Sequence, residues 1–241
     1  MDRDTSFPTL SVHQRVQFPL PEEASDIVAV GGNLSVGMLI SAYEQGVFPW
    51  YEDPSPIIWW SPRQRLVLSV GSLHVSRRMR RIIRQAEDIT VTADTAFDEV
   101  ITACASAGRG REEGTWITAE MQRAYIDLHE AGFAHSIEAW RGDALVGGLY
   151  GVSLGCAFFG ESMFSRTPNG SKFCLQKLHE LLEALEFLFI DCQVRTDHML
   201  SLGAAEIERD RFLAMLEEAL RSPSITGSWS GLLSVHTRSR R

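Results

Sequence analysis

A carboxylate within an apolar run is the first group in this chain that could take part in chemistry. Across residues 158–164, the alternation of a β-strand would place Phe159, Glu161 and Met163 on one face. A glutamate with such neighbours must pair with a cation or lose its charge. Glu161 is therefore either paired internally with an arginine, the commoner outcome, or held ready for a cationic ligand.

A pair of polar residues interrupts a second apolar run. In residues 190–194, strand alternation would project Asp191 and Gln193 from the same face. They could form a hydrogen-bonded pair that aligns a reacting amine, or they could lie at the strand end in solvent, which the residues alone favour slightly. His135 and His198 have no serine or cysteine partner that the sequence can place, so we interpret both as structural.

Aromatic residues and prolines are concentrated in residues 48–62. The aromatic residues there are Phe48, Trp50, Tyr51, Trp59 and Trp60. Their spacing fits neither a strand nor a helix, and the prolines remove backbone donors, so we predict an ordered loop. Its aromatic faces could stack on nucleobases, sugars or partner aromatics, or they could cap a small core, which is the more frequent use of tryptophan.

The overall composition indicates a soluble globular protein. At 241 residues and 44% hydrophobic content, the chain suits one large domain or two small ones. No run approaches the roughly 20 apolar residues that span a bilayer, and residues 1–9 lack the apolar core of a signal peptide, so we expect a cytoplasmic protein. The cysteines are widely spread and no histidine lies at zinc-ligand spacing. We expect free thiols, no disulfide framework and no structural metal.

Positive charge is clustered on an otherwise acidic chain. The formal net charge of -8 argues against indiscriminate binding of nucleic acid. Residues 77–84 nevertheless contain Arg77, Arg78, Arg80, Arg81 and Arg84. The intervening apolar residues have helical spacing, so the arginines would form one face of a helix. That face is either a solvated surface or a contact for phosphate oxygens, and the residues alone leave both open.

The hydrophobic pattern predicts an α+β fold. We expect helices that begin after Ser35, Ser76 and Asp94, and further helices over residues 118–130, 171–186 and 210–220. The predicted strands cover residues 65–70, 89–93, 133–140, 144–152, 156–164 and 187–194, with a hairpin turn at residues 141–143. A domain boundary near residue 63 would separate a small domain, residues 1–63, from a larger one, residues 64–241.

The predicted order of elements suits an acyltransferase of the acetyl-CoA-dependent kind. Those proteins have a strand meander followed by a strand-helix-strand crossover, although a shared fold carries no function by itself. The chain has neither of the common glycine-rich phosphate-binding loops. An acyl donor would therefore be held in another way.

Several short motifs follow one another along the chain. They are Gly31-Gly32-Asn33-Leu34, Gly46-Val47-Phe48-Pro49-Trp50, Trp59-Trp60-Ser61-Pro62, Glu113-Gly114-Thr115-Trp116-Ile117, Gly160-Glu161-Ser162-Met163-Phe164-Ser165 and Asp191-Cys192-Gln193. Together they make the chain closely resemble the bacterial leucyl/phenylalanyl-tRNA-protein transferases. The resemblance extends from about Phe18 to about Leu216.

This resemblance implies a fold and a reaction. The fold would be a small N-terminal α/β domain followed by an acetyltransferase-like (GNAT-like) mixed β-sheet domain flanked by helices. The enzyme would move leucine or phenylalanine, and less readily methionine, from aminoacyl-tRNA to the N-terminal arginine or lysine of a protein. The product would enter the bacterial N-end rule pathway of degradation. The family also implies a cytoplasmic monomer without metal or organic cofactor.

The resemblance further implies roles for individual residues. Asp191 and Gln193 match a catalytic pair in which the carboxylate polarises the amide, so that the amide oxygen draws a proton from the attacking α-amine. Glu161 would bind the positively charged acceptor residue or its amine. The positions that match tRNA-binding and aminoacyl-binding residues are Trp50 and Trp116 for the terminal adenosine, Leu149, Phe158 and Leu178 for the aminoacyl side chain, and Arg77 and Arg81 for the tRNA backbone.

Some positions depart from the family pattern, and two other functions remain open. Residues 107–110 make the approach to Glu112 longer and more glycine-rich than the family pattern, which puts the position of the loop that bears Trp116 in question. Glu208 stands where proline is expected, and residues 220–241 match poorly. One alternative is an acyltransferase that uses a small acyl donor, which the tryptophans and the missing phosphate loop argue against. The other is a binder of basic N-termini or tRNA ends without catalysis.

Overall fold

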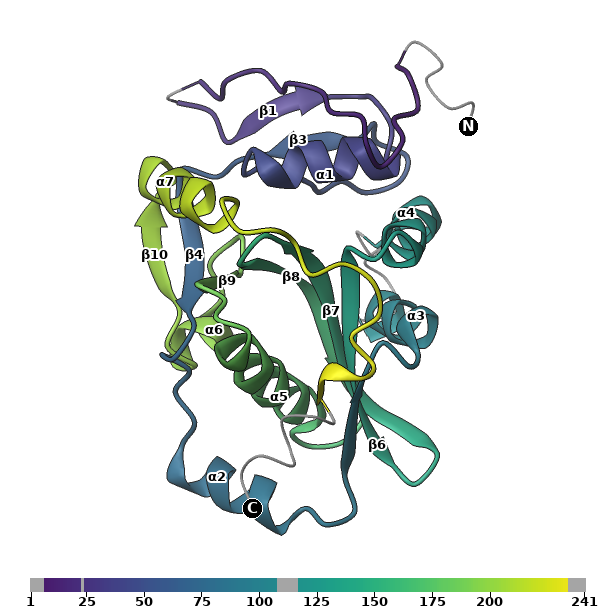
Figure 1. Ribbon diagram of the computed structural model, residues 1–241, viewed down its shortest axis with the longest axis vertical. Coiled ribbons are helices and arrows are strands. Elements are labelled where there is room, and N and C mark those ends of the chain that lie inside the picture. Colours follow the sequence, from purple (N-terminus) through teal and green to yellow (C-terminus); the bar gives the residue numbers. More distant parts are fainter. Residues whose placement is uncertain (1–6, 23, 108–116, 234–241) are drawn as a thin grey trace.

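The computed structural model describes residues 7–22, 24–107 and 117–233 and is drawn in Figure 1. Its helices are α1 (Val36–Glu44), α2 (Arg77–Gln85), α3 (Phe97–Ala107), α4 (Ala119–Glu130), α5 (Gly170–Ala184), α6 (Asp197–Ser201) and α7 (Arg209–Ala219). Its strands are β1 (Ile27–Val30), β2 (Phe48–Pro49), β3 (Ile58–Trp60), β4 (Gln64–Ser69), β5 (Thr90–Ala93), β6 (Ala134–Arg141), β7 (Ala144–Leu154), β8 (Ala157–Ser165), β9 (Phe189–Asp191) and β10 (Ala205–Glu208).

A seven-stranded mixed sheet forms the centre of the molecule. Its strand order is β10-β4-β9-β8-β7-β6-β5, and only the β8–β9 pair is parallel. Helix α5 connects these two strands and packs on one face of the sheet, while α3 and α4 cover the other (Figure 1). The predicted meander, hairpin and strand-helix-strand crossover are therefore confirmed.

A bulge in β8 changes which side chains share a face. The β7–β8 register shifts between Tyr150 and Gly151, and Glu161 is the extra residue opposite them. Phe159 packs into the core on the α3 and α4 side, whereas Met163 packs against the core on the α5 side. The prediction that Met163 shares a face with Phe159 is wrong, because the bulge interrupts the strand alternation.

Strand β9 is shorter than the predicted strand over residues 187–194. Its pairing with β8 ends at Phe159 and Asp191. Gln193 has a φ of 60°, a left-handed conformation that a continuing strand does not adopt. Strand β8 continues beside β7 to Ser165, so β8 and the chain after β9 diverge. This divergence opens a gap within the sheet.

The aromatic segment contains short strands instead of the predicted loop. Strand β3 pairs with β1 and β2 in a three-stranded sheet beside α1. Phe48, Tyr51 and Trp59 are buried in the core that also holds α3 and α4, so they confirm the core-capping alternative. Trp50 and Trp60 stay partly exposed. Buried residues between Phe18 and Trp59 share this core with residues of the large sheet, and the domain boundary near residue 63 stays a prediction.

The arginine-rich segment is helical, as predicted. The Ser76 hydroxyl accepts a hydrogen bond from the Met79 backbone N–H at 3.2 Å and caps α2. All of the helix's arginines are exposed. Ser35 lies at the N-terminus of α1 as expected, but its hydroxyl accepts the Leu10 N–H at 3.0 Å and makes no cap bond.

Candidate active site

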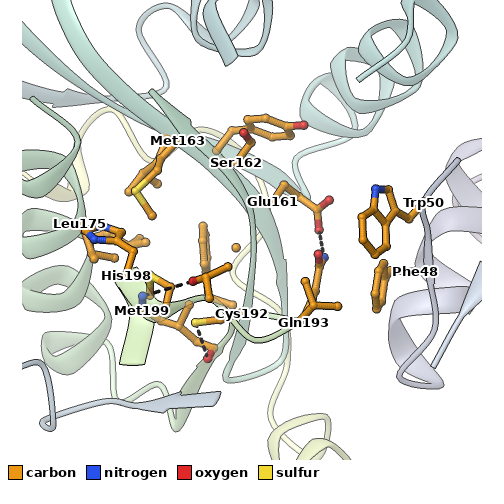
Figure 2. Close-up of a pocket in the computed structure, with 18 of the residues that line it drawn as sticks. Phe48, Trp50, Glu161, Ser162, Met163, Leu175, Cys192, Gln193, His198 and Met199 are labelled. Carbon is orange, nitrogen blue, oxygen red and sulfur yellow. Dashed lines mark hydrogen bonds between the residues drawn. The ribbon is translucent and has the colours of Figure 1, made fainter. Parts of the chain in front are cut away.

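The gap between β8 and the chain after β9 holds a cavity of about 360 Å³. One side is formed by Gly160 to Met163 and the other by residues 192–194, 196, 198 and 199, which include Gln193 and His198. Helix α5 contributes Leu175 and Leu178, and residues 48–50 close the opposite end. Figure 2 shows Glu161 and Gln193 near Trp50 and Phe48, with Leu175, Met163 and His198 farther along the cavity.

The structure brings most of the predicted site residues to this one cavity. The predicted residues that line it are Trp50, Leu149, Phe158, Glu161, Leu178 and Gln193. Asp191 lies behind the cavity wall, fully buried. Arg77 and Arg81 are on α2, outside the cavity lining. Trp116 lies outside the described residues.

Glu161 is held by side-chain hydrogen bonds on both of its oxygens. Tyr43 donates to Oε1 at 2.7 Å, Tyr125 donates to Oε2 at 3.0 Å, and the Gln193 amide nitrogen donates to Oε1 at 2.7 Å. Burial raises the pKa of Glu161 from 4.5 to about 7, and the hydrogen bonds from the two tyrosines oppose that shift. Near neutral pH the side chain therefore exchanges between the acid and the carboxylate. Among the described residues, Glu161 pairs with no arginine: its partners there are two tyrosines and an amide.

Two tyrosines that sequence reasoning did not assign to the site fix the position of this carboxyl group. Tyr43 on α1 and Tyr125 on α4 are fully buried, and their hydroxyls also lie in contact with each other. Each phenol has only one proton, so a tyrosine that donates to its neighbour does not donate to Glu161 at the same time. Burial raises the pKa of both phenols, with the nearby Glu161 charge as a further cause, so both stay protonated. The sequence did contain a sign of this role for Tyr43. The residue lies on the inward side of its predicted helix, and a buried phenol requires a polar partner.

Gln193 presents its side chain to the cavity from a left-handed turn. Its backbone N–H donates to Asp191 Oδ1 at 2.9 Å, which fixes the turn. Its amide nitrogen bonds Glu161, so the amide oxygen is the group left to accept a proton or a donor from a ligand.

Asp191 is buried and paired, so the solvent position favoured for it is wrong. Arg65 on β4 donates from Nε to Oδ1 at 2.9 Å and from Nη2 to Oδ2 at 2.6 Å. Asp191 is completely buried, and only 8% of Gln193 is exposed. The carboxylate reaches the backbone of Gln193, while the side-chain amide of Gln193 reaches Glu161.

The far part of the cavity is mostly apolar. Leu149, Phe158 and Leu178 are buried there beside Met163 and Leu175. These side chains offer shape and no hydrogen bonds, which suits a large apolar side chain.

His198, interpreted as structural from the sequence, also lines the cavity. Burial lowers its pKa, and the positive charge of Lys172 lowers it further. The sequence could not place His198 here, because the short helix α6 that carries it was not predicted.

Trp50 forms an aromatic wall at the other end of the cavity. Its ring lies 5.8 Å from the ring of Trp60 at an interplanar angle of 52°. The Trp60 indole N–H donates to the Trp50 carbonyl at 2.7 Å, which holds the backbone of this wall in place. Because Trp50 remains partly exposed, its ring is available for stacking.

The described residues form neither a metal-binding cluster nor a membrane-spanning helix. No group of three or more histidine, cysteine, aspartate or glutamate side chains in residues 7–22, 24–107 and 117–233 could hold a metal ion. In the same part of the chain, no helix is long and apolar enough to cross a membrane.

Comparisons with known proteins agree on one family. The family model described as "Leucyl/phenylalanyl-tRNA protein transferase" matches residues 67–217, and the model of that family's N-terminal domain matches residues 32–63. A protein named leucyl/phenylalanyl-tRNA--protein transferase from Syntrophus aciditrophicus is 54% identical over 204 residues, which is 85% of each chain. The protein of the same name from Desulfatibacillum aliphaticivorans is 49% identical over 225 residues, covering 92% of this chain and 96% of its own. The chain belongs to the leucyl/phenylalanyl-tRNA-protein transferase family, whose members are aminoacyltransferases.

Proposed function

We propose that this protein transfers leucine or phenylalanine, and less readily methionine, from aminoacyl-tRNA to the N-terminal arginine or lysine of proteins. One observation carries the proposal: the Glu161–Gln193 pair lies between an aromatic wall at Trp50 and an apolar pocket. An aminoacyl ester bound between wall and pocket has its carbonyl carbon near that pair. Family membership supports the choice of substrates.

The donor occupies the length of the cavity. The terminal adenosine stacks on Trp50, with Trp116 as its second neighbour, and the aminoacyl side chain enters the pocket formed by Leu149, Phe158 and Leu178. Stacking on aromatic side chains is how proteins usually read single-stranded RNA ends. An apolar pocket separates near-isosteres by only about 1 to 3 kcal/mol, so the enzyme accepts leucine, phenylalanine and methionine with weak discrimination.

The acceptor binds beside Glu161. A protein that begins with arginine or lysine carries two positive charges at its terminus, and the carboxylate of Glu161 attracts them in a site partly removed from water. Because burial raises the Glu161 pKa to about 7, this attraction strengthens as the pH rises through neutrality.

The chemical step is attack of the acceptor's α-amine on the ester carbonyl carbon. A new C–N bond forms, the ester C–O bond breaks, and the terminal adenosine leaves with its hydroxyl restored by the proton that the amine loses. The Gln193 amide oxygen accepts a hydrogen bond from the attacking amine, and Glu161 holds the amide in that orientation. The reference pKa of an α-amine is about 7.7 to 8.0, so a useful fraction is already nucleophilic near neutrality.

Asp191 acts on the same step through Gln193. Its carboxylate accepts the Gln193 backbone N–H and not the side-chain amide. We therefore assign it to hold the turn that presents Gln193, and any polarisation of the amide by Asp191 would have to act across the backbone.

The remaining proposals concern the domain fold, the tRNA contacts and the place of the reaction in the cell. The parallel, diverging strands β8 and β9 support an acetyltransferase-like (GNAT-like) catalytic domain over residues 64–241, after a small domain over residues 1–63. Arg77 and Arg81 contact the tRNA backbone, since both are exposed on α2. The protein acts as a cytoplasmic monomer, and its products enter the N-end rule pathway.

The test is transfer of labelled phenylalanine from phenylalanyl-tRNA to peptides. A peptide that begins with arginine should be labelled, and the same peptide beginning with glutamate should not. Labelling of neither peptide, with tRNA binding retained, would identify a binding protein without catalysis. Failure to bind aminoacyl-tRNA would instead favour an acyltransferase that uses a different donor.

A further inference from the structure

A buried arginine joins the two chain segments that lead to Trp50 and to Gln193 in the cavity. Arg65 on β4 is only 1% exposed, so it lies in the core, although arginine is usually a surface residue. Burying a guanidinium is unfavourable unless its charge is paired and its N–H groups are hydrogen-bonded. The partners of Arg65 therefore indicate what its position achieves.

On one side, Arg65 holds the segment that leads to the aromatic wall. Its Nη1 donates to the Gly46 carbonyl at 3.2 Å, and its guanidinium carbon lies 4.7 Å from the centre of the Phe48 ring. Phe48, Pro49 and Trp50, which follow Gly46 after Val47, line the cavity. The Phe212 ring of α7 lies on the guanidinium as well, 4.5 Å from the same carbon.

On the other side, Arg65 holds the turn that presents Gln193. Both oxygens of Asp191 accept from Arg65, and Oδ1 also accepts the Gln193 backbone N–H. The left-handed conformation of Gln193 is uncommon for a residue with a side chain, so surrounding contacts must maintain it. Without Arg65, Asp191 would be an unpaired buried charge next to this turn.

We propose that Arg65 is a positioning residue for the transfer reaction, which fixes the Gln193 amide relative to the Trp50 wall. This inference rests on the proposed function, because it assigns the two groups to acceptor and donor. Arg65 touches neither substrate. It acts by joining the backbone at Gly46 to the carboxylate of Asp191 through one rigid planar group.

The planar fork of arginine is essential to this role. The guanidinium edge makes two hydrogen bonds to Asp191 and one to the Gly46 carbonyl. Its flat faces contact the rings of Phe48 and Phe212. Lysine keeps the charge but has neither the fork nor the flat face. Arg65→Lys therefore removes the planar, multiply bonded group but keeps a positive charge beside Asp191.

Arg209 provides a matched control. It is also a buried arginine, 9% exposed, and it donates to the carbonyls of Ser25, Ser61 and Glu22. None of these partners lines the cavity. Arg209→Lys therefore also replaces a buried guanidinium, but it removes no contact to Gly46, Phe48 or Asp191.

The experiment compares wild type, Arg65→Lys and Arg209→Lys in steady-state transfer, at a temperature where each variant is folded by circular dichroism. We expect Arg65→Lys to lower kcat by about 10- to 100-fold, the range that a small misplacement of reacting groups produces. Its KM for aminoacyl-tRNA should change by a smaller factor than kcat, since the apolar pocket is intact and only the segment that leads to Trp50 loses a contact. Arg209→Lys should keep kcat within about twofold of wild type. Equal losses of kcat in the two variants would overturn the proposal.

A second measurement follows the position of the Gln193 side chain independently of the transfer reaction. Glutamine labelled with nitrogen-15 gives a side-chain amide signal for Gln193, identified by its loss in Gln193→Ala. Arg65→Lys should move or broaden that signal and Arg209→Lys should leave it in place; an unchanged signal in Arg65→Lys would refute the inference. If wild type itself transfers nothing, the proposed function fails, and this signal still decides whether Arg65 positions Gln193.

Discussion

The stability of the protein should depend on pH through Glu161. In the folded protein burial raises the pKa of this carboxyl group from 4.5 to about 7. Between these values the folded state binds a proton that the unfolded state has released, so stability falls as the pH rises. The gap corresponds to about 3 kcal/mol, an upper limit because the side chain is partly exposed.

Glu161→Gln removes this titration and nearly preserves the shape of the side chain. Urea unfolding of both proteins at pH 5 and at pH 8 gives the difference in their free energies of unfolding. Wild type and variant have all other titrating groups in common, so the contributions of those groups cancel in the difference between the two free energies of unfolding. From pH 5 to pH 8 the variant should gain up to about 3 kcal/mol relative to wild type. A difference that stays the same at both pH values would show that Glu161 titrates normally and refute the reasoning.

Three further predictions follow from other parts of the structure. Arg77→Ala or Arg81→Ala should weaken tRNA binding and lower the slope of log affinity against log salt by about one, measured by fluorescence anisotropy; an unchanged slope would remove α2 from the interface. Leu178→Ala, at a side chain only 1% exposed, should cost about 2 to 5 kcal/mol in urea unfolding and shift donor use toward bulkier side chains in competition assays. Wild-type donor preference would contradict its place in the pocket. Trp229→Ala, which removes a fully buried ring stacked on His135, should cost about 3 to 5 kcal/mol in the same unfolding assay, and a loss below about 1 kcal/mol would mean that the segment after α7 contributes little to stability.

Much of the fold could be predicted from local sequence signals. The hairpin of β6 and β7, the crossover helix α5 and the arginine-rich helix α2 all agree with the pattern of apolar residues and caps. The strands of the aromatic segment could not be predicted in the same way. They are two or three residues long, and pairing with partners distant in sequence stabilises them.

The candidate site was harder to predict because it depends on irregular backbone. Glu161 is aimed at Tyr43 and Tyr125 by a bulge, and Gln193 is presented by a left-handed turn. Strand alternation describes neither conformation. Arg65 was missed for a different reason: its charge in a strand gives no sign of the distant carboxylate that it pairs with.

The most direct test of the proposed mechanism is a single-turnover transfer of phenylalanine to a peptide that begins with arginine, by wild type and by Gln193→Ala. The affinity of each protein for phenylalanyl-tRNA is measured in the same preparation. Our account predicts that the variant loses most of its transfer rate and keeps wild-type affinity, because the amide oxygen acts on the attacking amine. A variant that binds weakly but, once saturated, transfers at the wild-type rate would contradict it and place Gln193 in donor binding alone.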